Sequence, residues 1–217
     1  MLSVPIIYRS IQNEEELRSL WEFDFTAYGE AGLSWDIFLS WWKAFPEGIH
    51  GVFSGDIIIG AIGMWPLRSS SYNLMSSGKM SEKDISPADF NLDSDLKRHW
   101  YISGIVLREE WRRTGPIGAL IFTAVERLGV LSNLDRVDLC AIASTKEGMR
   151  MLDRFGFSSR SIKTSDGHPI YISSDLVLDL ALGEKSVEAT SPNFRYKTSL
   201  RQGFSSNFDL DDLRSDI

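Results

Sequence analysis

The sequence predicts a single α/β (α+β) domain in which helices flank a mixed, mostly antiparallel sheet of six to seven strands. Two pairs of β-branched and aromatic runs each surround a short turn, Ser54-Gly55 in one pair and Ser165-Asp166-Gly167 in the other, and this pattern predicts two β-hairpins. Elsewhere, apolar strands alternate with helices that carry recognisable capping residues. Of the 217 residues, 43% are hydrophobic, and no internal repeat is present, which is typical of one globular domain.

The individual elements follow from these patterns. The expected strands are residues 4–11, 51–54, 56–66, 100–107, 137–143, 157–163 and 169–178. Three of the expected helices begin after the N-cap residues Asn13, Ser34 and Ser144, and a fourth begins at Ile117. The helix that follows Ser144 ends at Gly156. The aromatic residues of the second helix are expected to pack in the core, and a wall of an acyl or substrate pocket is the alternative.

Three stretches define the predicted organisation. We expect residues 1–183 to form the domain, with an insertion at about residues 68–97 where the strand and helix patterns loosen. Within the insertion, Ser81 and Asp84 have capping-box spacing and predict a short helical turn. Residues 184–217 are polar with scattered aromatics, and we expect a flexible tail or a segment that docks onto a partner.

Composition excludes several classes of function. A net charge of −7 with a pI near 5 disfavours a nucleic-acid partner, because such binding depends on clustered lysine and arginine. A single cysteine, Cys140, and three scattered histidines indicate no metal site and no internal disulfide. The apolar runs are too short to cross a bilayer, and the first residues lack a signal-peptide pattern, so we expect a cytoplasmic protein without a membrane partner.

One segment stands out as a site for chemistry, the run from strand to basic glycine loop to helix at residues 104–120. Gly104 within the strand predicts a bulge or a close backbone approach. The unpaired N–H groups of a helix N-terminus, with Arg112, Arg113 and Gly115 just before it, suit a phosphate or pyrophosphate. The alternative is an ordinary strand-to-helix turn with solvated arginines, and solvation is also expected for Arg108.

Two blocks in this order resemble the GCN5-related N-acetyltransferase (GNAT) superfamily. The first, residues 107–117, lies along the family's central strand, its Arg/Gln-x-x-Gly-x-Gly/Ala loop and the helix that follows. The second is a strand and a helix finishing in Gly-Phe, at residues 137–157. The resemblance extends over about residues 5–178 and implies that acetyl-CoA lies in a V between two splayed, central parallel strands.

The resemblance also implies which residues bind the cosubstrate. Backbone groups around Ile105, Val106 and Leu107 would bind the pantetheine arm, and the loop Arg112, Arg113, Thr114, Gly115, Pro116, Ile117 and Gly118 would bind the pyrophosphate. Three positions differ from the family pattern. Ile117 replaces the last motif glycine, Pro116 removes an amide donor, and Leu152 stands where many members carry a tyrosine that protonates the CoA thiolate.

The reaction implied is attack of a neutral amine on the thioester, with a backbone amide polarising the carbonyl. A lysine-like amine has a pKa near ~10 and needs an acceptor for its proton. Glu82 and Asp84 in the insertion are the candidate catalytic bases, and Glu109, Glu110 and His99 are the alternatives.

We therefore expect an acetyl-CoA-dependent N-acyltransferase that acts on a primary amine. A non-catalytic acyl-CoA-binding or interaction module is the alternative, which Leu152 and Pro116 favour. A Rossmann-type nucleotide-binding domain is a weaker interpretation, because the chain lacks Gly-x-Gly-x-x-Gly. The sequence does not identify the acceptor amine.

Overall fold

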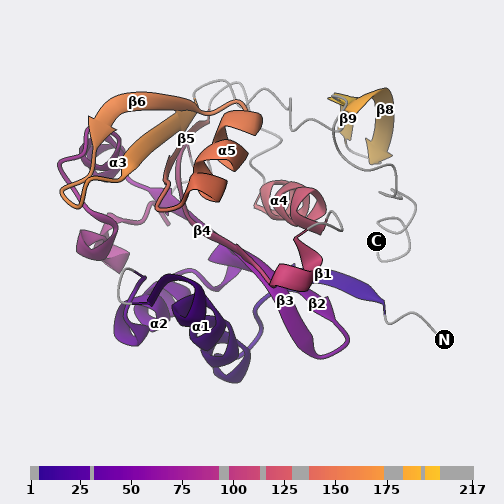
Figure 1. The fold of residues 1–217 in the computed structure, drawn as a ribbon, viewed down its shortest axis with the longest axis horizontal. Helices are drawn as coiled ribbons and strands as arrows, with labels where there is room; N and C mark the ends of the chain where they lie inside the picture. The colour runs from indigo at the N-terminus through magenta and orange to yellow at the C-terminus, as the bar shows by residue number, and fades with distance from the viewer. Residues whose placement is uncertain are drawn as a thin grey trace.

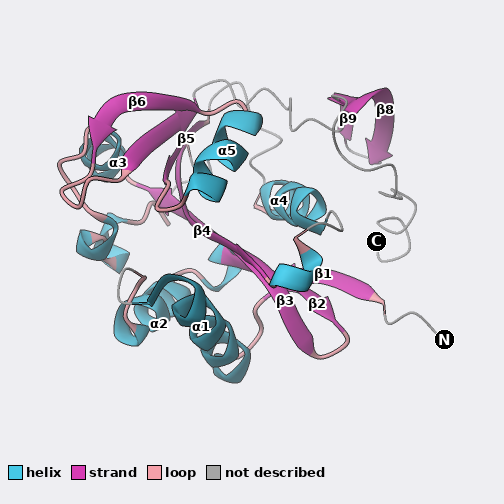
Figure 2. Cartoon of the chain, in the orientation of Figure 1, coloured by secondary structure: helices cyan, strands magenta, loops and turns pink. Residues whose placement is uncertain are grey.

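The computed structural model describes residues 5–29, 32–92, 98–112, 116–128, 137–173, 183–191 and 194–200. Its strands are β1 Ile6–Ser10, β2 Ile49–Ser54, β3 Ile57–Leu67, β4 His99–Leu107, β5 Asp138–Ile142, β6 Ser158–Lys163, β7 Pro169–Ser173, β8 Gly183–Ser191 and β9 Phe194–Leu200. Its helices are α1 Glu14–Tyr28, α2 Trp35–Ala44, α3 Ser69–Ser76, α4 Pro116–Arg127 and α5 Lys146–Arg154 (Figures 1 and 2). Short 3₁₀ turns occupy Pro46–Gly48, Glu82–Asp84, Pro87–Asp89 and Glu109–Trp111.

Seven strands form one sheet in the order β1-β2-β3-β4-β5-β7-β6. Every neighbouring pair in it is antiparallel except β4 and β5, which are parallel and are connected through α4. Both predicted hairpins are present, β2–β3 around Ser54-Gly55 and β6–β7 around the Ser165–Gly167 turn. The predicted mixed, mostly antiparallel sheet with a central parallel pair is confirmed.

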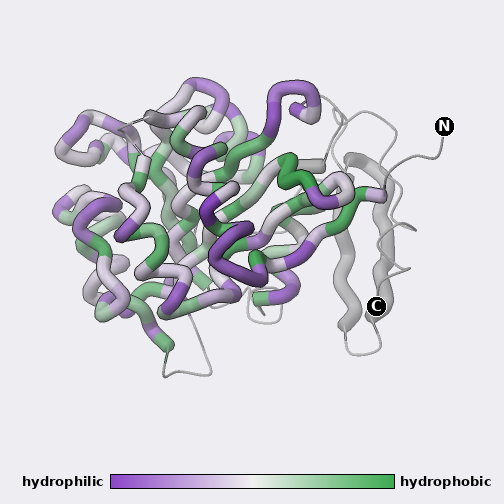
Figure 3. Tube along the Cα trace, turned by 90° about the horizontal axis from the view of Figure 1, so that it is seen from below, coloured by the Kyte–Doolittle hydropathy of each residue, from purple (hydrophilic) through white to green (hydrophobic). Residues whose placement is uncertain are grey.

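Helices cover both faces of this sheet. In Figure 1, α1 and α2 lie together on one side, and α4 and α5 lie on the other. Apolar stretches run along the interior strands, and hydrophilic stretches lie in peripheral loops and turns (Figure 3). Trp41 of α2 is fully buried, and its ring centroid lies 5.1 Å from that of Trp65 on β3 in an edge-to-face arrangement. The core interpretation of this α2 aromatic is therefore confirmed.

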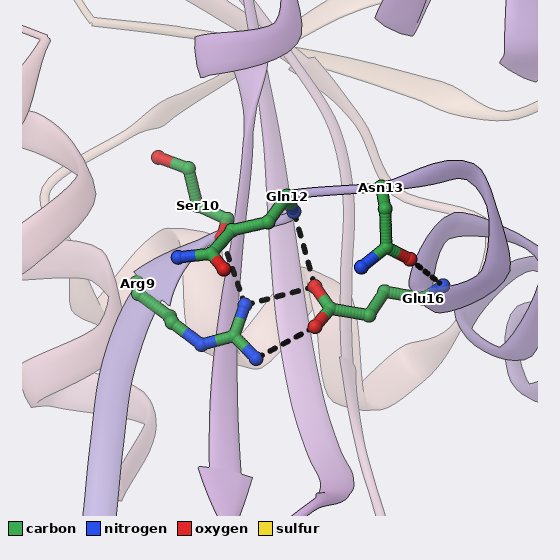
Figure 4. A network of polar contacts seen from close by, with 5 residues as sticks. All are labelled: Arg9, Ser10, Gln12, Asn13 and Glu16. Atoms are coloured by element: carbon green, nitrogen blue, oxygen red, sulfur yellow. Dashed lines mark hydrogen bonds and ion pairs between the residues drawn. The ribbon is translucent and has the colours of Figure 1, made fainter.

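The start of α1 is tied to β1 by a polar network (Figure 4). The Asn13 side chain caps the helix by accepting from the Glu16 N–H at 2.9 Å, as the sequence predicts. The Glu16 carboxylate turns towards the Arg9 guanidinium, with two N–O distances of 2.8 Å, and also accepts from the Gln12 N–H. This bidentate pair joins the first strand to the first helix, and the Arg9 side chain lowers the pKa of Glu16.

Three predictions about local elements need correction. Thr145, not Ser144, is the N-cap of α5, because its hydroxyl accepts from the Gly148 N–H at 3.0 Å. The 68–97 insertion contains the helix α3, which a serine-rich sequence does not favour but which the burial of Tyr72 and Met75 stabilises. Within 184–217, where no regular element was expected, β8 and β9 pair with each other. The Ser81–Asp84 capping box is confirmed.

One buried histidine gives the fold a pH-dependent stability. His50 on β2 is 1% exposed, and its Nε2 lies 3.3 Å from Ser10 Oγ, while its Nδ1 has no hydrogen-bond partner among the described residues. Burial, with a smaller contribution from Arg127, lowers the pKa of His50 from 6.5 to about 4.

We expect the free energy of unfolding to fall as the pH is lowered from 6.5 to 4. His50 takes up its proton near pH 6.5 in the unfolded chain and only near pH 4 in the folded chain. The free energy of unfolding should therefore decrease by roughly 3 kcal/mol over this pH range. His50→Gln should remove this contribution and flatten the curve, as measured by urea denaturation at several pH values. An unchanged pH dependence in the variant would contradict the assignment.

Candidate active site

The two parallel strands separate in the middle of the sheet. They pair from His99 and Asp138 to Ile102 and Ala141, after which β4 continues to Leu107 while β5 ends at Ile142. Beyond the pairing, none of the described strands pairs with the edge of β4 that faced β5. A cleft opens at this point between β4, α1, α5 and the insertion.

A β-bulge lies where the strands separate. The β3–β4 register pairs Gly63 with Gly104 but Met64 with Ile102, so Ser103 is the extra residue. Its hydroxyl accepts from the Trp65 indole N–H at 2.8 Å and occupies the space that a side chain on Gly63 would need. The bulge that Gly104 predicted is thus present, one residue before the glycine.

Beyond the bulge, backbone groups alternate between β3 and the cleft. The Arg108 N–H bonds to the Ile59 carbonyl, which makes the Gly60–Leu107 and Ile62–Ile105 pairs the non-hydrogen-bonded ones. The amides and carbonyls of Ile105 and Leu107 therefore point away from β3. Their carbonyls accept from the Tyr28 hydroxyl at 3.3 Å and from Arg112 Nε at 3.1 Å, respectively.

Because of this alternation, the backbone groups of the three strand residues implied as the pantetheine site do not all face the same side. Ile105 and Leu107 present backbone groups to the cleft side, whereas those of Val106 face β3. Gly104 lines the cleft, and a Cβ built on it meets no described atom within 4 Å. The cleft is therefore open along this edge.

Glu82, one of the two candidate bases, lines the cleft. It lies in the 3₁₀ turn Glu82–Asp84, and its carboxylate accepts a hydrogen bond from the buried hydroxyl of Tyr101 on β4. Burial, reinforced by the negative charges of Asp24 and Asp166, raises the pKa of Glu82 to about 8, although the Tyr101 bond acts in the opposite direction. A carboxyl group with this pKa can exchange a proton near neutral pH.

Asp84 lies outside the cleft lining. It is exposed, and its carboxylate accepts from the Ser81 N–H at 2.9 Å and from the Ser81 hydroxyl at 2.8 Å, which lowers its pKa. The Ser81–Asp84 pair closes the turn that carries Glu82. Asp84 therefore stabilises the turn, and Glu82 is the one of the two candidate bases that lines the cleft.

The alternative bases also lie away from the cleft. His99 stacks on the Tyr72 ring, with centroids 4.7 Å apart, and its Nδ1 lies 3.3 Å from Asp138 Oδ2. Glu109 and Glu110 are exposed on a separate 3₁₀ turn. Cys140 is buried in β5, where burial raises the pKa of its thiol well above the usual range, so it is no nucleophile.

Two titratable residues on α1 line the cleft and were not among the residues predicted from the sequence. Asp24 and Tyr28 lie one turn apart near the end of α1, and both line the cleft. Burial raises the pKa of Asp24 to about 6 and that of Tyr28 to about 12, and the Asp24 charge adds to the effect on Tyr28. In the sequence both belong to the polar side of an amphipathic helix, and no motif marks them.

The predicted pyrophosphate loop is described only in part. Arg113, Thr114 and Gly115 lie outside the described residues, while Pro116, Ile117 and Gly118 form the first turn of α4. Arg112 lies just before this turn, with its Nε bonded to the Leu107 carbonyl. The prediction of a loop that leads directly into a helix N-terminus is consistent with this arrangement.

Two further residues, Leu152 and Arg108, test what was expected near the cosubstrate strand. Leu152 on α5 is 4% exposed and lines the cleft, so an apolar side chain occupies the place where the family resemblance implies a tyrosine. Arg108 was expected to be solvated, and this was wrong. Its Nε donates to the Ile58 carbonyl at 2.7 Å, and its guanidinium lies 4.9 Å from the centroid of the Phe23 ring.

Within the described ranges, no group of three or more histidine, cysteine, aspartate or glutamate side chains could hold a metal ion. None of the helices in the same ranges is long and apolar enough to cross a bilayer.

A mixed sheet with one central parallel pair that separates into a cleft defines the fold class of the protein. Within this class, the model of the Acetyltransferase (GNAT) family matches residues 14–157, and the chain belongs to that family. It is therefore an enzyme of the acetyltransferase type. This assignment favours the enzyme over the non-catalytic module.

Solved structures share the fold at low sequence identity. The loading GNATL domain of CurA from Lyngbya majuscula matches with a TM-score of 0.58 and 14% identity over 79% of this chain and 98% of that one. Ard1 from Thermoplasma volcanium matches with a TM-score of 0.53 and 14% identity over 78% and 95%. The diaminobutyrate acetyltransferase EctA from Paenibacillus lautus, in complex with L-2,4-diaminobutyric acid and coenzyme A, matches with a TM-score of 0.51 and 10% identity over 80% and 96%. No curated protein matched in the sequence search.

Proposed function

We propose that the protein transfers an acetyl group from acetyl-CoA to a primary amine, with Glu82 as the base that receives the amine proton. The observation that carries the proposal is the position of the Glu82 carboxylate in the cleft where β4 and β5 separate. The amine acceptor of EctA, a fold relative, supports an amine in this cleft.

The unpaired edge of β4 fits the extended arm of CoA. The N–H groups of Ile105 and Leu107 face the cleft side as those of a neighbouring strand would, and this edge supplies mainly donors because the two carbonyls already accept from Tyr28 and Arg112. Gly104 leaves open space beside them. Arg112 and the first turn of α4, with the loop Arg113–Gly115 before it, would take the pyrophosphate through charge-assisted and N-terminal N–H bonds.

The chemistry assigns one role to each group. The free amine attacks the thioester carbonyl, a C–N bond forms, and the C–S bond breaks. Glu82 accepts the proton that the amine loses, and backbone N–H groups on the β4 edge stabilise the negative charge on the carbonyl oxygen. Because Leu152 has no proton to give, solvent protonates the departing thiolate.

Acetyl-CoA should raise the melting temperature of the purified protein. A ligand that binds only the folded state stabilises it by about 2.7 kcal/mol at a hundredfold excess over Kd. ATP at the same concentration is the matched control, since it has phosphates and adenine but no pantetheine arm, and it should give a much smaller shift. A flat titration with acetyl-CoA would contradict the proposed function. Mass spectrometry of an amine panel incubated with acetyl-CoA then identifies products that have gained an acetyl group.

A further inference from the structure

The cleft of the proposed transferase has an excess of negative charge. Asp24 on α1, Glu82 in the insertion and Asp166 in the β6–β7 turn all line it, and they come from three separate elements. The basic residues among the described lining are Lys83 and His168. The charges of Asp24 and Asp166 both act on Glu82, so the three carboxylates face a common space.

Asp24 lies in the cleft wall, where it is partly buried. The described residues provide it with no hydrogen bond or ion pair, and Gly32 on the cleft wall lies beside it, with a built Cβ 3.5 Å from Asp24 Oδ2. Burial raises the pKa of Asp24 to about 6, so the group is still ionised at neutral pH. A buried carboxylate without a cation is unfavourable, and a bound cation offsets that cost.

The wall near Asp24 is otherwise apolar. Leu20, Leu33, Phe38 and Ile49 line the cleft together with the ring of Tyr28. An alkyl chain can lie against such a surface, with polar groups at its two ends.

We infer that the acceptor is an alkyl diamine, with the reacting amino group beside Glu82 and the second, protonated amino group bound by Asp24. This inference rests on the proposed function and adds the substrate class. The reaction is the one given above, in which one amine loses its proton to Glu82 and forms the amide, while the other stays charged. A monoamine lacks the second cation, and an amino acid with a terminal carboxylate would be repelled by Asp24.

The test compares three acceptors of similar length, 1,4-diaminobutane, butylamine and 4-aminobutyrate, with acetyl-CoA and detection of released CoA thiol. We expect kcat/KM for the diamine to exceed that for butylamine by about 10- to 100-fold, and 4-aminobutyrate to be the poorest. Asp24→Asn should lower the ratio of kcat/KM for the diamine to kcat/KM for butylamine by about tenfold, so that the preference collapses, whereas any change in the pKa of Glu82 caused by the lost charge affects both acceptors alike. Glu15→Gln, an exposed carboxylate on the same helix, is the matched control and should preserve the preference.

The outcomes separate the inference from the function on which it rests. Equal use of diamine and butylamine, with both unaffected by Asp24→Asn, would overturn the diamine assignment and leave the transferase intact. Preferred acetylation of a peptide N-terminus would do the same. Failure of acetyl-CoA to bind wild-type protein would instead overturn the proposed function. Normal acetyl-CoA binding by Asp24→Asn, measured by thermal shift, shows that the variant is folded.

Discussion

Replacement of Glu82 by glutamine should lower kcat/KM for the acceptor amine by about 10²–10⁴-fold, the usual cost of losing a positioned base. Burial raises the pKa of Glu82 to about 8, so the carboxylate becomes available as a base only as the pH approaches this value. For the wild type, kcat/KM should therefore rise through about pH 8. In the variant this rise should disappear, and what remains should follow the titration of the amine itself.

Asp84→Asn is the matched comparison for this experiment. Asp84 lies in the same 3₁₀ turn, is exposed and bonds to Ser81 rather than lining the cleft. An asparagine oxygen can keep the bond to the Ser81 N–H, so we expect activity near that of the wild type. Wild-type kcat/KM and pH profile in Glu82→Gln would contradict the assignment of Glu82 as the base.

Stability provides a second, independent measurement on Glu82. The pKa of a glutamate is 4.5 in its ordinary state and about 8 in the folded protein, so the folded state holds the proton more tightly. The free energy of unfolding therefore decreases as the pH rises from 4.5 to 8, and the loss is complete above pH 8. Glu82→Gln removes this loss, so the variant should melt at a higher temperature than the wild type at about pH 8–9. A gain in stability together with a loss of activity is typical of an active-site charge.

The sheet could be predicted from the sequence because its signals are local. Turn residues such as Ser54-Gly55 and the caps Asn13 and Ser34 act within a few residues, and the structure has each of them in the expected place. The helix α3 was missed for the opposite reason. Its serines have little helix preference, and it is held by the packing of Tyr72, whose hydroxyl donates to the Leu139 carbonyl on β5.

The candidate site could be predicted only where a motif marks it. The cosubstrate strand and the loop after it have a recognisable pattern, and Glu82 was favoured because it lies in an insertion beside the cleft. Asp24 has no such mark, since its role depends on the packing of α1 against the end of β4 and on the loss of water around its carboxylate. Distinguishing Glu82 from Asp84 likewise required the geometry of one turn, in which Glu82 lines the cleft and the Asp84 carboxylate accepts from Ser81 at the start of the turn.

Gly104→Val should weaken acetyl-CoA binding by about 5- to 150-fold, which corresponds to the roughly 1–3 kcal/mol that overpacking of a fitted space costs. The valine side chain would enter the cleft beside the Ile105 and Leu107 edge, where a Cβ meets no described atom. For the same reason the fold should tolerate the substitution. The free energy of unfolding should be unchanged or slightly higher, because a β-branched residue suits a strand better than glycine.

Gly60→Val provides the matched control. Gly60 pairs with Leu107 on the neighbouring strand, and unlike Gly104 it has no open space for a side chain. A Cβ there lies 2.6 Å from Leu107 Cδ1 and 2.8 Å from the Val106 carbonyl oxygen, so this variant should lose stability, by about 1–3 kcal/mol. Isothermal titration with acetyl-CoA and urea denaturation of both variants would separate the two effects. Tight acetyl-CoA binding by a folded Gly104→Val protein would place the cosubstrate away from the β4 edge.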